Sequence, residues 1–516
     1  MTRNRRPNVL IFCVDQMRAD HMAPSGNWVV QTPNLQQLAD GGTLFSRSYC
    51  ANPICMPARH SMFTGLLPRD HGVRINGHYP VRDLPYLPQL LSDGGYRTHA
   101  SGKLHLTPWV PKEVPANPGK YPESLDHWSR GAIDEFPDDY FGFQSTDFVG
   151  GHTSYAYGDY TAWLTDRGGD PAMLTKEHAE DTTGNVFETY AMGVPEELHY
   201  NRFIADSTIR SIETAVQSES PFLEWCSFPD PHHPIAPPSR YSRMYDPASI
   251  PLPVKRDGEM DSMPAYYREL ITGELEVWNS AVAHTPPDHT RQMIANTYGM
   301  ITHFDEEMGR VLRALDRLGQ REQTAVLFVC DHGDMMGDHG LHFKGTFTYR
   351  GCTEIPTIVN IPWIAGSGIS EALVSQVDLL PSILELCGIE YPGSLWCNDD
   401  APFPRGMKQD LSSGGSKSWL PLVRGDTANR RNAVVIENDD PYLGYHVRCL
   451  VTDRHRLTIY PGTGDGELFD LQEDPHELFN RWYDPAFSST RRELTALLLD
   501  EYAAASPFAP IPAWNA

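Results

Sequence analysis

The segment NVLIFCV, residues 8–14, is a continuous apolar run that ends at an Asp-Gln pair. A second run, TAVLFVC, residues 324–330, ends at an Asp-His pair. Uninterrupted apolar runs of this length are typical of central parallel strands that are covered on both faces. Open α/β sheets bind ligands at the carboxyl ends of such strands, so we expect the four polar residues to lie together at a site. They are Asp15, Gln16, Asp331 and His332.

The sequence around these runs predicts a helix-covered sheet followed by a smaller unit. Apolar residues recur at helical spacing over residues 288–318, and Gly319 follows as a stop signal. We expect this helix to cover one face of the sheet. Beyond residue 378, three short runs predict antiparallel strands, and a terminal helix follows. These elements span residues 433–437, 445–452, 456–460 and 490–505.

We therefore expect two parts, a main α/β body over residues 1–377 and a small α+β subdomain over residues 378–516. Residues 107–220 are rich in Gly, Pro, Tyr, Trp and Asp and show weak periodicity. That composition predicts an insertion of loops over the site and not a second core. Substrate selection is expected in these loops.

The chain of 516 residues has 42 Lys and Arg against 67 Asp and Glu, a formal charge of −25. This surplus repels nucleic acid and acidic membrane surfaces, so neither is an expected partner, and an anionic substrate must be held by a local cluster of cations. No apolar stretch has the length of a membrane span or of a signal-peptide core. Nine cysteines without a CxxC pair predict a reduced, cytoplasmic protein.

Residues 55–59, Cys-Met-Pro-Ala-Arg, match the short motif C-x-P-x-R, and their surroundings are typical of a turn that enters a helix. By itself the motif is not decisive, because three fixed positions also occur by chance. Other polar motifs along the chain give it significance. They are Asp15-Gln16, Gly102-Lys103-Leu104-His105, Pro231-His232-His233-Pro234, Asp331-His332-Gly333-Asp334 and Lys344.

In order and spacing these motifs resemble those of the sulfatases, which belong to the alkaline-phosphatase superfamily. The resemblance covers most of the chain. Further landmarks of that family occur at residues 32–35, 354–356, 378–382, 467–471 and 474–475. The resemblance implies an alkaline-phosphatase-like α/β fold, with a large mixed, mostly parallel sheet between helices and a smaller C-terminal subdomain with an antiparallel sheet.

The resemblance also implies the nucleophile. In the family, the Cys of the motif is oxidised to formylglycine, so a formylglycine-generating maturation enzyme is an expected partner. By resemblance, that residue is Cys55. One hydroxyl of the hydrated aldehyde takes the sulfuryl group to give a sulfo-enzyme intermediate. The other hydroxyl then loses its proton and expels sulfate by C–O cleavage, so water need not attack the sulfur.

Each position of the site then has an implied role. The ligands of one divalent metal ion would be Asp15, Gln16, Asp331, His332 and the modified Cys55. The cations that hold the diol and the sulfuryl oxygens would be Arg59, Lys103 and Lys344. The proton-transfer residues would be His105, for the diol, and His232, for the leaving alcohol, with His233 as the competing choice.

The metal positions depart from the commonest sulfatase pattern. Many members have Asp-Asp and Asp-Asn where this chain has Asp-Gln and Asp-His. The imidazole and the missing carboxylate favour Mn²⁺ or Zn²⁺, although Ca²⁺ with one His ligand occurs in the family. The same set, with Asn76 in a following Asn-Gly pair, resembles phosphonate monoester hydrolases and related phosphodiesterases. Asn76 is explained as well by a structural turn as by a substrate contact.

The sequence thus predicts hydrolysis of a small anionic ester, a sulfate monoester such as an aryl sulfate. The first alternative is a phosphonate monoester or phosphodiester hydrolase that uses the same site. The remote alternative is an inactive metal-binding protein in which Cys55 is an unmodified, buried small hydrophobe. Family members with long C-terminal segments often associate, so we expect a homo-oligomer.

Overall fold

The computed structural model describes residues 6–80, 84–111, 117–272, 274, 285–364, 366, 368–390, 415–428, 430–440 and 444–504. Its largest element is an eight-stranded sheet. In spatial order, the strands are β5 (Ser145–Phe148), β4 (Arg97–Gly102), β6 (Phe222–Phe228), β1 (Asn8–Val14), β7 (Thr324–Cys330), β8 (Thr357–Asn360), β2 (Thr43–Phe45) and β9 (Gly368–Ser370). Only β8 runs antiparallel to its neighbours β7 and β2, so the predicted mixed, mostly parallel sheet is confirmed.

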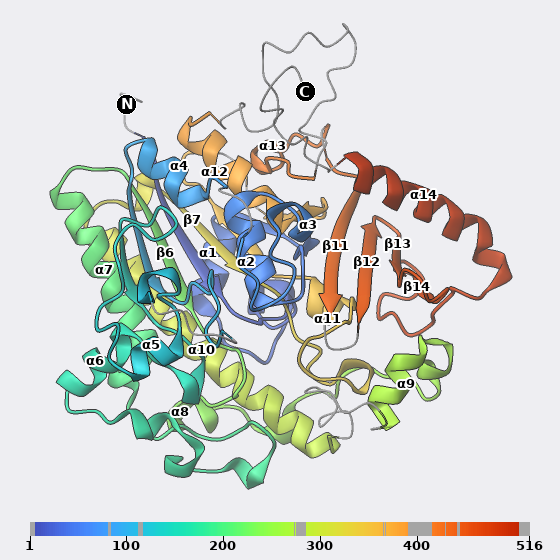
Figure 1. Cartoon of the computed structure of the whole chain (residues 1–516), viewed down its shortest axis with the longest axis horizontal. Coiled ribbons are helices and arrows are strands. Elements are labelled where there is room, and N and C mark those ends of the chain that lie inside the picture. Colours follow the sequence, from blue (N-terminus) through green and yellow to red (C-terminus); the bar gives the residue numbers. More distant parts are fainter. Residues whose placement is uncertain are drawn as a thin grey trace, which may run out of the picture.

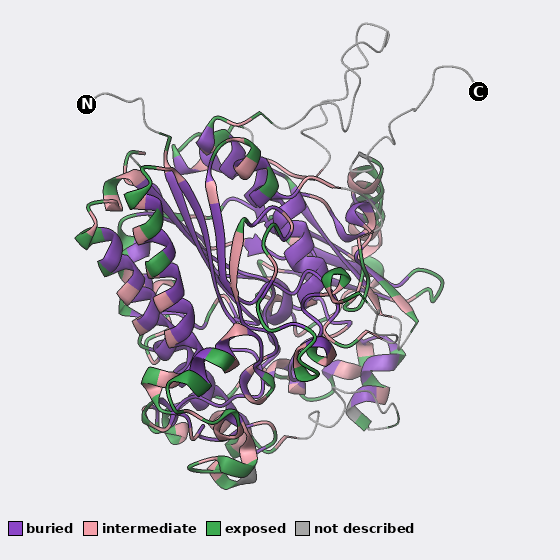
Figure 2. Cartoon of the chain, turned by 60° about the vertical axis from the view of Figure 1, so that its left-hand side comes forward, coloured by how far each residue is buried: buried purple, intermediate pink, exposed green. Residues whose placement is uncertain are grey.

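Helices cover both faces of this sheet (Figure 1). One face packs against α1 (Pro33–Asp40), α7 (Tyr200–Gln217) and α10 (Pro287–Arg317), and the other against α2 (Cys55–Thr64), α4 (Leu87–Asp93) and α12 (Leu379–Cys387). Side chains of β1 alternate between the two cores. Leu10 and Phe12 belong to the first core, whereas Val9 and Ile11 belong to the second. Because neither face meets water, the positions from Val9 to Val14 are all apolar, which explains the uninterrupted run (Figure 2).

The predicted helix over residues 288–318 is confirmed as α10. Its apolar stripe packs against the central strands, and the rings of Phe304 and Phe328 lie 6.2 Å apart between centroids. Both strand predictions at residues 8–14 and 324–330 agree with the bounds of β1 and β7.

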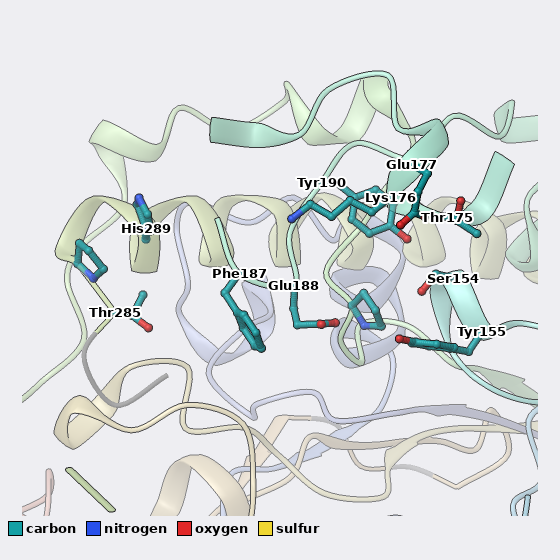
Figure 3. A pocket seen from close by; sticks show the side chains of 12 residues that line it. Ser154, Tyr155, Thr175, Lys176, Glu177, Phe187, Glu188, Tyr190, Thr285 and His289 are labelled. Atoms are coloured by element: carbon teal, nitrogen blue, oxygen red, sulfur yellow. The ribbon is translucent and has the colours of Figure 1, made fainter. Parts of the chain in front are cut away.

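The prediction of loops throughout residues 107–220 is wrong for four elements: β5 and the helices α5 (Leu125–Ser129), α6 (Asp159–Asp166) and α7. β5 forms the edge of the large sheet, and α7 packs against the sheet and α10. The buried face of α7 includes Ser207, Thr208 and Ser211, so its hydrophobic periodicity is weak in the sequence. The loops of this region border a cavity of about 750 Å³ (Figure 3).

The C-terminal region contains a separate four-stranded antiparallel sheet, as predicted. Its strands are β11 (Ala433–Asp440), β12 (Tyr445–Thr452), β13 (His455–Ile459) and β14 (Gly466–Asp470), and α14 (Ser488–Ala504) follows. The fourth strand was not predicted, because its five residues include Gly466 and two acidic side chains. Residues 391–414 and 505–516 of the predicted subdomain lie outside the described residues. Since α12 packs with α2 and α4, we propose that the subdomain begins after α12 and not at residue 378.

Short elements complete the described chain. They are α3 (Pro68–His71), α5 (Leu125–Ser129), α6 (Asp159–Asp166), α8 (Ser239–Ser242), α9 (Ala265–Thr272), α11 (Arg350–Thr353), α13 (Leu420–Val423), β3 (Ser48–Tyr49) and β10 (Val374–Ser375). Among the described residues, no helix has the length and apolar character needed to cross a membrane. The eight described cysteines are free and buried, and Cys397 lies outside the described residues.

We expect Phe328→Ala to lower the free energy of unfolding by about 3–5 kcal/mol, because it removes a ring from the core beneath α10 and leaves a cavity. The matched control is Leu499→Ala, whose side chain is 67% exposed and whose loss should change stability by less than about 0.5 kcal/mol. Urea denaturation followed by circular dichroism measures both. Similar losses in the two variants would contradict the packing described here.

Candidate active site

Two neighbouring strands deliver carboxylates to the same point. β1 and β7 are parallel with Val14 opposite Cys330, so the next residues, Asp15 and Asp331, lie side by side. Both are fully buried. Neither begins a helix, and Asp331 Oδ1 accepts a hydrogen bond from the backbone N–H of Gln16 at 3.1 Å. The alternative role of the two aspartates as helix caps is therefore wrong.

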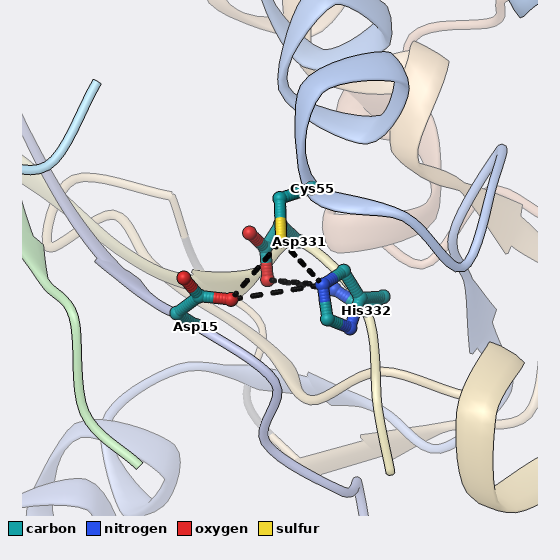
Figure 4. A group of neighbouring side chains, drawn as sticks. All are labelled: Asp15, Cys55, Asp331 and His332. Carbon is teal, nitrogen blue, oxygen red and sulfur yellow. Dashed lines mark hydrogen bonds and ion pairs between the residues drawn. The ribbon is translucent and has the colours of Figure 1, made fainter. Parts of the chain in front are cut away.

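Cys55 is the first residue of α2, and its side chain points toward the two strand ends (Figure 4). Its Sγ lies 3.1 Å from His332 Nε2, 3.3 Å from Lys344 Nζ and 3.8 Å from Asp15 Oδ1. The residue is 1% exposed. The C-x-P-x-R motif therefore begins a helix, as expected, and places its Cys inside a group of charged side chains.

Four side chains offer ligand atoms to one metal ion. The ligand atoms of Asp15, Cys55, Asp331 and His332 all lie within 4.8 Å of one another. His332 Nδ1 lies 3.0 Å from the backbone oxygen of Gly333, and a ring that donates there presents Nε2 as an acceptor. Two carboxylates and an imidazole in a buried space fit a divalent cation.

Gln16 is the predicted ligand that the structure places apart from this group. Its Oε1 accepts a hydrogen bond from Lys344 Nζ at 2.6 Å. Its Nε2 lies 2.5 Å from Asp334 Oδ2 and 3.0 Å from His233 Nδ1. The oxygen and the nitrogen of the Gln16 amide thus both contact other side chains. To bind a metal ion, Gln16 Oε1 would have to give up its hydrogen bond with Lys344.

Three buried cations surround the two carboxylates. Arg59 Nε donates to Asp331 Oδ2 at 2.9 Å, and Lys103 forms an ion pair with Asp15. Lys344 lies against Cys55, as described above. The alternative that the lysines lie on solvated faces is therefore wrong, and the cluster of cations expected from the charge of the chain is present. Arg59 Nη2 has no hydrogen-bond partner in the described chain and is available to a ligand.

These charges shift the ionisation of the site. Burial disfavours the charged form of Asp15, but Lys103 and the neighbouring histidines hold the pKa of its carboxyl well below the usual value. Burial and the charge of Asp15 also disfavour a thiolate at Cys55. Lys103, Lys344 and His332 outweigh them and lower the pKa of the thiol.

His232 lies beside Lys344, and its Nε2 is 2.7 Å from Lys344 Nζ. Its Nδ1 lies 2.5 Å from the backbone oxygen of His233. The ring of His233 contacts Gln16 and Phe343, the latter at 4.1 Å between ring centroids. The two candidate acids therefore differ in position: Nε2 of His232 contacts Lys344, whereas Nδ1 of His233 contacts Gln16.

His105 is buried near the group, but no hydrogen bond joins it to Cys55 in the described part of the chain. Its ring stacks on Trp109 with centroids 3.7 Å apart, and its Nδ1 has no hydrogen-bond partner among the described residues. Lys103 Nζ lies 4.8 Å from the centroid of the same Trp109 ring. A free ring nitrogen in this position is compatible with proton transfer.

Asn76 is exposed and lies beside the start of α2. Its Oδ1 accepts a hydrogen bond from the backbone N–H of Met56 at 3.0 Å. This contact satisfies one of the free N–H groups of the helix N-terminus. Asn76 and Gly77 also form a turn, in which the backbone N–H of His78 donates to the backbone oxygen of Ile75 at 3.4 Å, as the structural alternative predicted. A contact between Asn76 and substrate stays a prediction.

The comparisons with known proteins decide the family. The family model of the sulfatases matches residues 7–389. The chain belongs to the sulfatase family. A second model, of the C-terminal region of N-sulphoglucosamine sulphohydrolase, matches residues 337–504.

Several relatives match nearly the whole length of this sulfatase. An arylsulfatase of Clostridium perfringens is 27% identical over 92% of this chain and 90% of its own. The multifunctional alkaline phosphatase superfamily protein PehA of Trinickia caryophylli is 26% identical over 95% of this chain and 93% of its own. The crystal structure of the phosphonate monoester hydrolase of Agrobacterium radiobacter has a TM-score of 0.79 at 22% identity, over 98% of this chain and all of that one. The last comparison shows the shared fold.

The site of this sulfatase also contains His152, which sequence reasoning missed. Its Nε2 lies 2.6 Å from Lys103 Nζ and 3.2 Å from Asp15 Oδ2. Its ring stacks on that of His232 with centroids 3.5 Å apart. His152 follows two glycines in a region without periodicity, and no motif marks it.

Glu123 is a second missed residue, and it holds the segment that carries His105. Its buried carboxylate accepts backbone N–H hydrogen bonds from His105, Leu106 and Thr107 at 2.6, 2.6 and 2.9 Å. The hydroxyl of Tyr140 donates to it at 2.7 Å. Because these partners come from two separate parts of the chain, residues 105–107 and Tyr140, no local pattern could have indicated them.

A further group of titratable side chains in this sulfatase, His199, Asp230 and His303, lies behind the site. The backbone N–H of Asp15 donates to the backbone oxygen of Asp230 at 3.2 Å. His199 Nδ1 accepts from the backbone N–H of Asn201 at 3.2 Å, so the proton of the neutral ring is on Nε2. Asn201 contacts all three residues: its Nδ2 donates to Asp230 Oδ2 at 2.8 Å and lies 3.5 Å from His303 Nδ1, so hydrogen bonds to Asn201 hold the group together.

Glu123→Ala should lower the free energy of unfolding by about 3 kcal/mol or more, because it leaves three buried N–H groups without an acceptor. Glu123→Gln keeps an acceptor oxygen and should lose less. Chemical denaturation measures both, with Glu135→Ala, an exposed Glu, as the control. An equal, small loss in all three variants would exclude this role of Glu123.

Proposed function

We propose that this sulfatase hydrolyses sulfate monoesters, aryl sulfates among them, with a nucleophile derived from Cys55. The observation that carries the proposal is the position of the Cys55 side chain. Cys55 is the first residue of α2, and its side chain lies near Lys344, His332 and Arg59. Two buried carboxylates lie beside this group. A sulfuryl group that meets this side chain is surrounded by positive charge, which stabilises the charge that develops on its oxygens.

We propose that Asp15, Asp331 and His332 hold one divalent metal ion, with Gln16 and the modified Cys55 as further ligands. When bound, the ion supplies positive charge that favours ionisation of the nucleophile. The donor set of two carboxylates and an imidazole suits Mn²⁺ and Zn²⁺, and Ca²⁺ also accepts it. Arg59 Nη2 lies 3.9 Å from Asp15 Oδ2 but has no hydrogen-bond partner among the described residues, so it can hydrogen-bond the nucleophile.

Formylglycine at position 55, once hydrated, supplies two hydroxyls on one carbon. In our proposal, Lys103 and Lys344 bind the sulfuryl oxygens as point charges, and both are already held in the site by ion pairs and hydrogen bonds. His105, with its free Nδ1, takes the proton from the second hydroxyl as sulfate departs.

His232 assists the leaving alcohol in this proposal. Its Nδ1 faces the backbone oxygen of His233 and donates to it, so Nε2 is the nitrogen that faces the leaving oxygen. Nε2 passes a proton only after it has received one, either as the imidazolium form or from Lys344 Nζ at 2.7 Å. Lys344 meets the same Nε2 and can stabilise the departing alkoxide. His233 is the weaker candidate, because its Nδ1 is occupied by the amide of Gln16.

A second candidate function uses the same site on phosphonate monoesters or phosphodiesters. It is supported by the multifunctional relative PehA and by the Asp-Gln and Asp-His pairs at the metal. The charge distribution of the site suits any tetrahedral anionic ester, so geometry alone does not separate the two substrates.

Two measurements test the proposal. Mass spectrometry of the peptide that contains Cys55, from enzyme made in its native host, should show an aldehyde in place of the thiol. The same sample should hydrolyse nitrophenyl sulfate faster than a phenyl phosphonate ester under identical conditions, and metal analysis should find a divalent ion. A large preference for the phosphorus ester would establish the second function. An unmodified thiol together with no turnover would favour an inactive metal-binding protein.

We expect His232→Ala to reduce turnover of esters with poor leaving groups by about 10²–10⁴-fold and turnover of activated nitrophenyl esters far less, because nitrophenolate departs without a proton. Rates across a series of leaving groups measure this dependence. His476→Ala, which removes an exposed histidine, is the control. An equal loss on all esters would remove His232 from the acid role, and His233→Ala would then be tested.

A further inference from the structure

The cavity of about 750 Å³ borders the chain segment that carries His232 and His233. Pro234, which lines the cavity, directly follows His233, and its backbone oxygen accepts from Thr153 Oγ1 at 2.7 Å. Ser154, on another wall, lies two residues after His152. The same short segments therefore present histidines to the reacting centre and wall residues to the cavity.

A second connection runs through Phe343. The ring of Phe187, which lines the cavity, lies 6.3 Å from that of Phe343, and Phe343 contacts His233 at 4.1 Å between centroids. The backbone N–H of Ile235 donates to the backbone oxygen of Glu188 at 2.6 Å, which fixes this wall against the histidine segment. An ester whose sulfuryl group lies at Cys55 would extend its alcohol portion toward this cavity.

Two aromatic rings of the cavity are open to solvent. Phe187 is 44% exposed and Tyr155 is 63% exposed, and in Figure 3 they lie on either side of Glu188. Exposed rings in a concave site offer flat apolar surfaces to a ligand. They suit the apolar face of a ring, which stacks on an aromatic side chain without an ionic partner.

The charged side chains of the cavity limit the ligand further. Glu177 and Glu188 contribute two carboxylates, and Lys176 contributes one ammonium group, whose Nζ also donates to the backbone oxygen of Val186 at 3.4 Å. Carboxylates and an ammonium group hydrogen-bond hydroxyls readily. Two carboxylates against one cation repel a second negative charge on the ligand, and the −25 charge of the chain acts in the same direction.

We propose that the cavity binds the leaving alcohol and that this alcohol is a sugar ring with several hydroxyls and no second anionic group. The inference rests on the proposed function, since it places the alcohol of the scissile ester in the cavity. Phe187 and Tyr155 stack on the apolar face of the ring. Glu188 and Lys176 bind its hydroxyls, and the carboxylates exclude uronates and sugars with a second sulfate.

The test uses the full chain, shown by mass spectrometry to carry the modified Cys55. Its substrates are nitrophenyl sulfate, monosulfated glucose and galactose at each sulfate position, and the disulfated forms of the same sugars. At least one monosulfated sugar should have a kcat/KM about tenfold or more above its disulfated form. Phe187→Ala should lower the kcat/KM for the monosulfated sugar, divided by that for nitrophenyl sulfate, about tenfold. Glu188→Gln should lower the ratio of kcat/KM for the monosulfated sugar to that for its disulfated form.

Two control variants remove similar side chains elsewhere. Trp28→Ala removes an 80% exposed aromatic ring, and Glu135→Gln neutralises an exposed carboxylate; neither should change these ratios. The inference would be overturned if the enzyme hydrolysed nitrophenyl sulfate but no sugar ester. It would also be overturned if disulfated sugars were hydrolysed as fast as monosulfated ones. A Phe187→Ala variant with an unchanged ratio would also overturn it. Modified enzyme that hydrolyses no sulfate ester at all would instead refute the proposed function.

Discussion

Two carboxylates buried side by side at adjacent strand ends are the constraint on which the rest of the site depends. Without compensation, Asp15 and Asp331 would repel each other and could not both be ionised in the interior. Lys103 pairs with the first and Arg59 with the second, so the charges are balanced before any ligand arrives. The whole chain carries a net charge of −25, so these buried cations form a local positive region in an acidic protein.

The elements that could be predicted from the sequence are those whose pattern is local. β1, β7 and α10 have periodicity that reflects burial directly, and the strand ends then locate Asp15 and Asp331. α7 was missed because its buried face is rich in Ser and Thr. His152 and Glu123 were missed for another reason: their role comes from packing between distant segments, which no pattern of neighbouring residues records.

The fold does not decide which ester is cleaved. The phosphonate monoester hydrolase of Agrobacterium radiobacter has the same architecture at 22% identity, and relatives of this sulfatase are named for several substrates. Function in such a fold is determined by the side chains around the strand ends. In this chain those side chains come from the ends of β1 and β7, from the start of α2, and from the segments that carry Lys103, His152, His232 and Lys344.

The burial of Cys55 affects the order of events during biosynthesis. In the folded chain Cys55 is the first residue of α2 and only 1% exposed, so a separate enzyme cannot reach its thiol. The proposed oxidation must therefore occur while the chain is still being synthesised or before its sheet has closed. The unmodified thiol already fits between His332 and Lys344, so a chain that escapes oxidation has no structural reason to misfold. The fraction of molecules that carry the modified residue is then determined during synthesis. The concentration of folded protein therefore does not equal the concentration of active enzyme.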